Sequence, residues 1–188
     1  EIIKGMESLA IELGVKIHTN SKIDKIVVEN NTVVGVQTKG SLIKSDIVVS
    51  GADYHHSETL LDNKYRQYSE TYWNKKVFAP SSLLFYIGLN KKIKNVKHHN
   101  LFFDANFETH AEEIYDNPKW PSRPLFYVNI PSKTDSSMAP ERCDAMFILI
   151  PIAPGLEDTT TMRNYYFGKV IKRFEEKTEQ SIQNNIIF

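Results

Sequence analysis

Hydrophobic residues change their spacing along the chain, and each spacing predicts a different element. Apolar residues recur at helical spacing over residues 2–13, which predicts an amphipathic helix that ends at Gly14. Two β-branched runs then flank the pair Asn30-Asn31, whose side chains tolerate the positive φ angles of a tight turn. The first part of the chain therefore predicts a helix followed by a β-hairpin over residues 23–39.

The stretch KSDIVVSGADYHH, residues 44–56, is the clearest junction in the sequence. The run Ile47–Val49 predicts a short buried strand, and the small residues before Asp53 predict a turn into a helix that Asp53 caps. Such a turn leaves backbone N–H groups accessible to a flat or phosphate-bearing ligand. An ordinary strand-to-helix connection is the alternative interpretation of these residues.

The later part of the chain is richer in aromatic residues, and the change lies near Asp62, where we place a domain boundary. Periodicity predicts helices over residues 54–61, 64–76, 107–115 and from Asp158 or Thr159 onward, and strands over residues 81–89, 101–103, 125–130 and 145–152. The expected fold class is α+β or α/β.

Composition excludes several functional classes. The 188 residues carry no formal net charge, so nothing in the overall charge favours nucleic acid as a partner. The single cysteine fits a reducing compartment, and no apolar run is long enough to span a bilayer. Because the chain begins with Glu1 inside a predicted helix, we expect it to be a piece of a longer protein.

Few residues form a recognisable catalytic pattern. The histidine pairs 55–56 and 98–99 lack the spacing and the acidic or thiol partners of a metal site, so no metal is predicted. The lysine-rich segment 91–97 predicts a solvated loop or a contact with anionic lipid. The aromatic residues of the predicted strands form either a core or the wall of a long apolar cavity, and periodicity does not separate the two.

Several segments resemble the bacterial phytoene desaturase family, which consists of FAD-dependent carotenoid desaturases of the amine-oxidase-like flavoprotein superfamily. The resemblance runs from residue 5 to residue 188 and is most specific in the segments HHNLFFD and NPKWPSRPLFYVNIPSKTD. More general flavoprotein features are the first helix, the hairpin and the segment VVSGAD. The chain contains no G-x-G-x-x-G motif, so the resemblance implies a central fragment of such an enzyme.

The resemblance implies part of a Rossmann-like FAD domain over residues 1–62, joined to an incomplete substrate domain with a mixed sheet and flanking helices over residues 63–188. Ile23 matches a residue whose backbone meets the adenine of FAD, and Ser50, Gly51 and Ala52 match a turn beside the cofactor. The expected substrate-binding residues lie on two predicted strands and are Phe85, Tyr86, Phe126 and Tyr127.

The implied activity is desaturation of a carotenoid such as phytoene in carotenoid biosynthesis. A hydrocarbon substrate offers no hydrogen bonds, so its binding depends on apolar burial and the redox chemistry belongs to the flavin. No catalytic acid or base is identified. The resemblance also implies a cytoplasmic enzyme bound to the inner face of the membrane. We expect FAD in the full-length protein and neither FAD nor activity in this fragment.

Two alternative functions remain open at this stage. A carotene isomerase or a carotenoid oxidase would use the same scaffold and share these motifs. The isolated fragment could instead be a non-catalytic domain that binds an apolar ligand. Neither the oligomeric state nor the particular carotenoid follows from the sequence.

Overall fold

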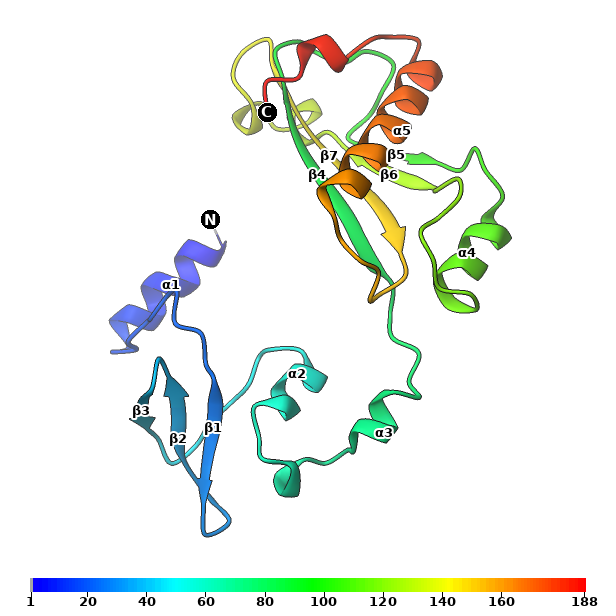
Figure 1. The fold of residues 1–188 in the computed structure, drawn as a ribbon. Helices are drawn as coiled ribbons and strands as arrows, with labels where there is room; N and C mark the ends of the chain where they lie inside the picture. Colours follow the sequence, from blue (N-terminus) through cyan, green and yellow to red (C-terminus); the bar gives the residue numbers. More distant parts are fainter. Residues whose placement is uncertain (1) are drawn as a thin grey trace. The chain divides into compact units, whose positions relative to one another are not determined.

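The computed structural model describes residues 2–188, and the chain divides into two compact units after Lys76 (Figure 1). The first unit contains a helix, a three-stranded sheet and short helices, and the second contains a four-stranded sheet with a long helix. All strand pairs in both sheets are antiparallel. The structure therefore has the predicted α+β class.

The first unit begins with helix α1 (Ile2–Glu12), and Gly14 follows as the terminating glycine, as predicted. Gly14 has φ +83°, its N–H donates to Ile11 O at 2.9 Å, and the next N–H, that of Val15, donates to Ala10 O at 2.9 Å. This is a Schellman motif, in which a left-handed glycine satisfies the last carbonyls of a helix. No residue of this helix is buried, and its large apolar side chains, from Ile2 to Ile11, are exposed.

The predicted hairpin is confirmed. Strands β1 (Lys25–Glu29) and β2 (Thr32–Thr38) pair antiparallel through a turn in which Asn30 and Asn31 have φ +49° and +63°. Two consecutive positive φ angles define the turn that matches the twist of a two-residue hairpin. Strand β3 (Ser41–Lys44) adds to β2, and Gly35 allows the close approach, because a Cβ there would lie 2.1 Å from Ile43 O.

The predicted strand over Ile47–Val49 is wrong. These residues belong to neither sheet, and Ile47 and Val49 are 77% and 89% exposed. β-Branched residues favour an extended backbone, but a strand also needs a neighbour for its N–H and C=O groups. No strand among the described residues pairs with this run.

Helix α2 (Tyr54–Thr59) starts as predicted, because the carboxylate of Asp53 accepts the His56 N–H at 3.0 Å. The long helix predicted over residues 64–76 is replaced by two short ones, η1 (Asn63–Tyr65) and α3 (Glu70–Trp73). The sequence pattern overestimated this helix.

A buried carboxylate explains why residues 63–76 pack with the first unit, past the boundary that was expected near Asp62. Glu58 is 5% exposed and accepts hydrogen bonds from the N–H groups of Gln67 and Tyr68 and from Trp73 Nε1. A buried carboxylate requires such donors, and these bonds take N–H groups that a continuous helix would use.

The second unit is built on strands β4 (Ser81–Leu89), β5 (His99–Phe102), β6 (Phe126–Asn129) and β7 (Asp144–Ile152), in the order β4-β7-β6-β5. The sequence therefore predicted the strands well but not the sheet type, because the sheet is antiparallel rather than mixed. Strands β5, β6 and β7 are neighbours in sequence and in space. Connections of this kind produce antiparallel pairing, whereas parallel neighbours need long crossovers.

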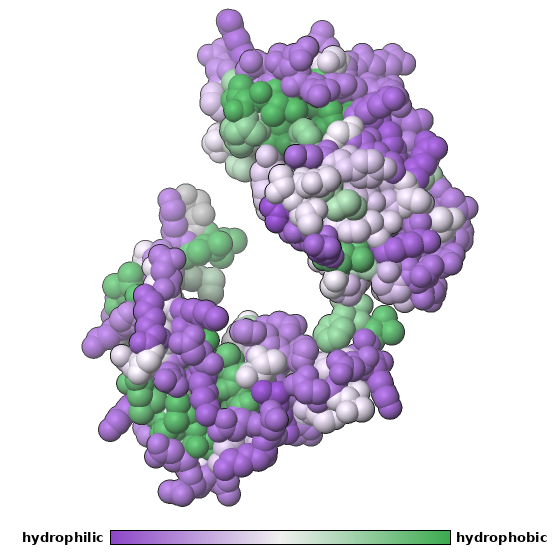
Figure 2. Space-filling view, viewed as in Figure 1, coloured by the Kyte–Doolittle hydropathy of each residue, from purple (hydrophilic) through white to green (hydrophobic). Residues whose placement is uncertain are grey.

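Alternation along the strands gives the sheet two different faces. Even-numbered residues of β7 and the odd-numbered residues 83–89 of β4 lie on the core side with helix α5 (Thr160–Thr178), whose buried stripe includes Tyr166, Val170 and Phe174. The other face carries partly or fully exposed aromatic and aliphatic side chains. Figure 2 shows apolar surface on both units.

Smaller elements complete the second unit. Helix α4 (Phe107–Tyr115) begins at Asn106, whose side chain accepts the Thr109 N–H at 2.7 Å. The remaining turns are η2 (Pro131–Lys133), η3 (Ser136–Met138) and η4 (Gln183–Asn185). The chain end pairs with β4, because the Gly88 N–H donates to Phe188 O at 3.1 Å.

Candidate functional site

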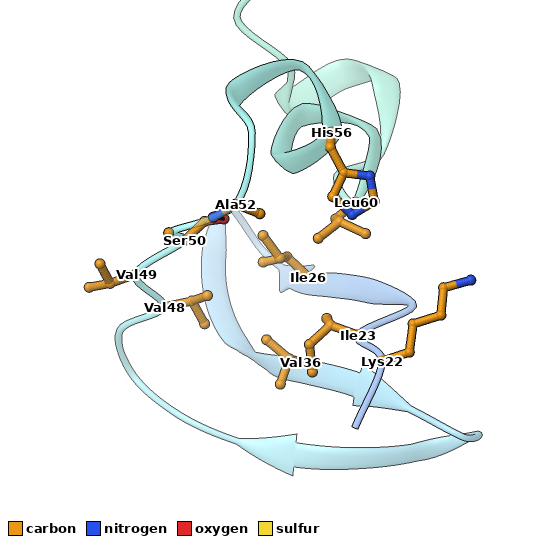
Figure 3. A pocket seen from close by; sticks show the side chains of 11 residues that line it. Lys22, Ile23, Ile26, Val36, Val48, Val49, Ser50, Ala52, His56 and Leu60 are labelled. Carbon is orange, nitrogen blue, oxygen red and sulfur yellow. Dashed lines mark hydrogen bonds between the residues drawn. The ribbon is translucent and has the colours of Figure 1, made fainter. Parts of the chain in front are cut away.

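The four residues predicted to contact a cofactor line one cavity of the first unit, of about 400 Å³ (Figure 3). Ile23 precedes β1, and Ser50, Gly51 and Ala52 lie in the connection that leads to α2. The lining is completed by Lys22, Ile26, Val36, Val48, Val49, His56 and Leu60. Tertiary structure thus brings together two segments that are more than twenty residues apart in sequence.

Hydrogen bonds hold the connection in place at the cavity. The hydroxyl oxygens of Ser50 and Ser57 are 2.6 Å apart, and the Ser57 hydroxyl donates to Asp53 O at 2.9 Å. The Ala52 N–H reaches Ser50 Oγ at 3.4 Å. These bonds tie the small-residue turn to the first turn of α2 and so position its backbone along the cavity.

The residues present fit the adenine end of a dinucleotide such as FAD. Ile23, Ile26 and Val36 point toward one another and form an apolar floor (Figure 3), and backbone amides with a serine hydroxyl lie at its edge. A Cβ on Gly51 would meet no atom within 4 Å, so the backbone there is open to a ligand. A flat ring with polar edges requires this combination of apolar walls and a few polar groups.

The second candidate site is the uncovered face of the sheet in the second unit, which we call the open sheet face. It consists of side chains that alternate with the core residues of the four strands: Leu84, Tyr86, His99, Leu101, Tyr127, Asn129, Phe147 and Leu149. Tyr86 and Leu101 are 70% and 65% exposed. Rings of Tyr86 and Tyr127 flank Phe147, with centroids 5.2 and 6.3 Å away.

The four predicted substrate-binding aromatics do not form one wall. Phe126 is 3% exposed and stacks on Phe102 in the core, and Phe85 packs against Phe167 of α5. Tyr86 and Tyr127 lie on the open sheet face instead. Successive residues of a strand point to opposite faces, so adjacent aromatics cannot share a surface.

A cavity of about 390 Å³ lies at one end of the open sheet face. Its lining is Tyr86, Asn129, Pro131, Met138, Ala145, Met146 and Phe147. Sequence reasoning did not identify Asn129 or Met138 as site residues. Asn129 lies two residues after Tyr127 on the same strand, so strand alternation could have placed both on one face. Met138 lies in a turn, whose position periodicity does not predict.

Two lysines make ion pairs with a buried carboxylate. Lys92 and Lys133 lie 3.1 and 3.2 Å from the carboxylate of Asp144, so part of the lysine-rich segment is tied to the core. Among residues 2–188, no group of three His, Cys, Asp or Glu side chains is arranged to hold a metal ion. No helix in that range is long and apolar enough to cross a membrane.

Comparison with solved structures first defines the class of fold. An oxidoreductase from Methanosarcina mazei has a similar fold over the whole chain, with a TM-score of 0.68 and 14% sequence identity, and the chain covers 40% of that protein. At this identity the likeness concerns the fold alone. No protein-family profile matches the chain.

Sequence relatives are more specific. A carotenoid 3,4-desaturase from Haloarcula japonica is 35% identical to the chain over all 188 residues, and this match covers 38% of the relative's length. A zeta-carotene-forming phytoene desaturase from Myxococcus xanthus is 31% identical over 80% of the chain and 29% of its own length. A 4,4'-diapolycopen-4-al dehydrogenase from Metabacillus indicus is 26% identical over 98% of the chain and 37% of its own length. The chain is therefore homologous to the carotenoid and phytoene desaturases, and it spans about a third of the length of these relatives.

Proposed function

We propose that the chain is the central part of an FAD-dependent oxidoreductase that desaturates a carotenoid. The observation that carries the proposal is similarity to carotenoid desaturases along the entire chain. Two features of the structure support it independently: a cavity that suits the adenine end of FAD, and a sheet with one uncovered apolar face.

The first unit would hold the cofactor in this proposal. Ile23 and the turn Ser50–Ala52 would contact the adenine end of FAD, with the aliphatic side chains beneath as its floor. FAD, when bound, supplies the acceptor for the hydride that leaves the substrate. The chain's contribution here is binding and positioning, and no residue is assigned to proton transfer.

The open sheet face would receive the substrate. A carotenoid is a long apolar polyene, so its binding energy comes from removing apolar surface from water, about 25 cal/mol for each Å². Tyr86, Leu101 and Phe147 offer such surface, whereas Phe85 and Phe126 support it from the core side. A membrane-dissolved substrate also suits an enzyme that docks on the inner, cytoplasmic face of the membrane, with exposed Lys94 and Lys97 toward anionic lipid.

The proposal is tested with the complete protein that contains this chain, supplied with FAD and with phytoene in liposomes. We expect a product with a longer conjugated polyene, seen as visible absorbance at longer wavelength. A product with an unchanged double-bond count would identify an isomerase, and a carbonyl product would identify an oxidase. Absence of any conversion of acyclic carotenoids would overturn the proposal.

A further inference from the structure

Three polar side chains form a hydrogen-bonded cluster on the otherwise apolar open sheet face. The hydroxyl oxygen of Tyr127 lies 2.6 Å from His99 Nδ1 and 2.8 Å from Asn129 Nδ2. Asn129 Nδ2 also lies 3.2 Å from His99 Nδ1. His99 and Asn129 are direct partners across β5 and β6, so the three side chains occupy one side of the sheet.

The hydrogen-bond donors and acceptors of this cluster determine which atoms carry the protons. The Asn129 amide has only N–H to donate at Nδ2, so it donates to the Tyr127 hydroxyl oxygen. Asn129 Nδ2, which can only donate, also contacts His99 Nδ1, so Nδ1 is an acceptor. The Tyr127 hydroxyl therefore donates to Nδ1, and the other ring nitrogen, Nε2, carries the proton. Within residues 2–188, no hydrogen bond uses His99 Nε2 or the side-chain oxygen of Asn129, Oδ1.

The cluster therefore presents one N–H donor and one carbonyl acceptor. A hydroxyl group carries one donor and two acceptor lone pairs, so it can satisfy both at once. A hydrocarbon satisfies neither, and it would cover polar groups that water otherwise solvates. The chemistry of the cluster thus matches an alcohol better than a pure hydrocarbon.

The position of the cluster connects it to an apolar binding surface. Asn129 also lines the cavity of about 390 Å³ together with Tyr86, Met138 and Phe147. Ligand sites commonly combine apolar walls with a few polar groups that fix orientation. Here the apolar walls suit a polyene, and the cluster adjoins these walls through Asn129.

We propose that His99, Tyr127 and Asn129 bind a hydroxyl group at the end of the polyene substrate and thereby select hydroxylated carotenoids over hydrocarbon ones. This inference rests on the proposed function, since it assumes that the open sheet face receives a polyene. Because His99 is exposed and Tyr127 and Asn129 are only partly buried, the preference in kcat/KM should be on the order of ten- to a hundredfold.

The test uses the complete protein with FAD and liposomes that contain either lycopene or its 1-hydroxy derivative. The wild type should favour the hydroxylated substrate, and Asn129→Leu should reduce the ratio of the two kcat/KM values about tenfold. Tyr127→Phe keeps the ring on the sheet and removes only the hydroxyl, so it should reduce the ratio without disturbing the fold. The matched control is Asn164→Leu, the same chemical change on the exposed side of α5, which should leave the ratio unchanged.

Failure of this inference is distinguishable from failure of the proposed function. Equal kcat/KM values for both substrates, or variants with the wild-type ratio, would overturn the hydroxyl site while leaving desaturation intact. If neither substrate is converted, the proposed function fails, and the hydroxyl site is then judged by dissociation constants for the two polyenes from quenching of tryptophan fluorescence. Equal dissociation constants would overturn it in that case as well.

Discussion

At the scale of single residues, Gly51 is the position where a side chain would most directly report on the cofactor. Its backbone lines the first cavity, and a Cβ there would meet no atom of the protein within 4 Å. The fold therefore tolerates a larger residue, whereas a ligand against this backbone would not.

Gly51→Val should reduce the FAD content of the complete purified protein severalfold while leaving its thermal unfolding unchanged. The measurement is the ratio of flavin absorbance to protein absorbance. Gly168→Val is the matched control, because Gly168 is also exposed, also has free space around its Cβ position and lies in the other unit. Full flavin content in Gly51→Val would remove this turn from the cofactor site.

Asp144 is the residue whose charge most clearly stabilises the second unit. Burial by itself would raise the pKa of its carboxyl, but hydrogen bonds from the Ile93 N–H, Ser132, Lys92 and Lys133 outweigh burial and hold the pKa below 3.8. Since the folded pKa lies below the unfolded one, this stabilisation is present above about pH 4 and is lost as the pH falls through the folded pKa.

Asp144→Asn should lower the free energy of unfolding by about 3 kcal/mol at neutral pH, because Lys133 and Lys92 lose their carboxylate partner. The free energy of unfolding of this variant should also fall less as the pH is lowered. Urea unfolding followed by Trp120 fluorescence at several pH values measures both effects. Asp158→Asn breaks an exposed pair with Arg163 and should change stability far less. Equal effects of the two substitutions would contradict this assignment.

At the scale of elements, one histidine joins two strands where their ladder ends. Continuing the register of β6 and β7 by two residues places Leu125 opposite Pro151, which has no N–H to donate. His110 of α4 lies between them: its Nδ1 accepts the Leu125 N–H at 3.1 Å, and its Nε2 donates to Pro151 O at 2.9 Å. The side chain is 4% exposed and thus replaces backbone pairing in the interior.

His110→Phe should lower the free energy of unfolding by about 3 kcal/mol, because it leaves a buried N–H and a buried C=O without partners. His110→Gln can retain one of the two bonds and should cost less. His18→Phe is the control at an exposed histidine and should have little effect. Chemical denaturation gives the free energy of unfolding of each variant. A His110→Phe variant as stable as the wild type would show that the bridge contributes nothing.

At the scale of the whole molecule, the two units differ in how much core they contain. The hydrophobic core cluster lies entirely within residues 77–188. Among the described residues of the first unit, Ile26 is the only buried hydrophobic side chain. Burial of apolar surface is the dominant favourable term in folding, so the second unit should be the more stable one.

Residues 77–188 expressed alone should therefore unfold cooperatively, with nearly the same urea midpoint as the Trp120 signal of the whole chain. Residues 1–76 alone should unfold at a much lower urea concentration, reported by Trp73. Each unit contains one of the two tryptophans, so fluorescence of the single substitutions Trp73→Phe and Trp120→Phe in the whole chain separates the signals. A single shared transition would contradict independent folding.

The sequence alone determined the features that depend on near neighbours in the chain. The hairpin turn and the cap at Asp53 follow from local backbone preferences, and the start of α5 was limited to Asp158 or Thr159. The strands over residues 81–89 and 145–152 were also evident from continuous apolar runs.

Only the tertiary structure decided the features that depend on distant partners. It left Ile47–Val49 outside both sheets, placed Phe126 rather than Tyr127 on the face that packs in the core, and joined His99 of β5 to residues of β6. The physical reason is common to all three: a strand, a sheet face or a polar cluster exists only when a segment remote in sequence supplies the other half of the hydrogen bonds or the packing.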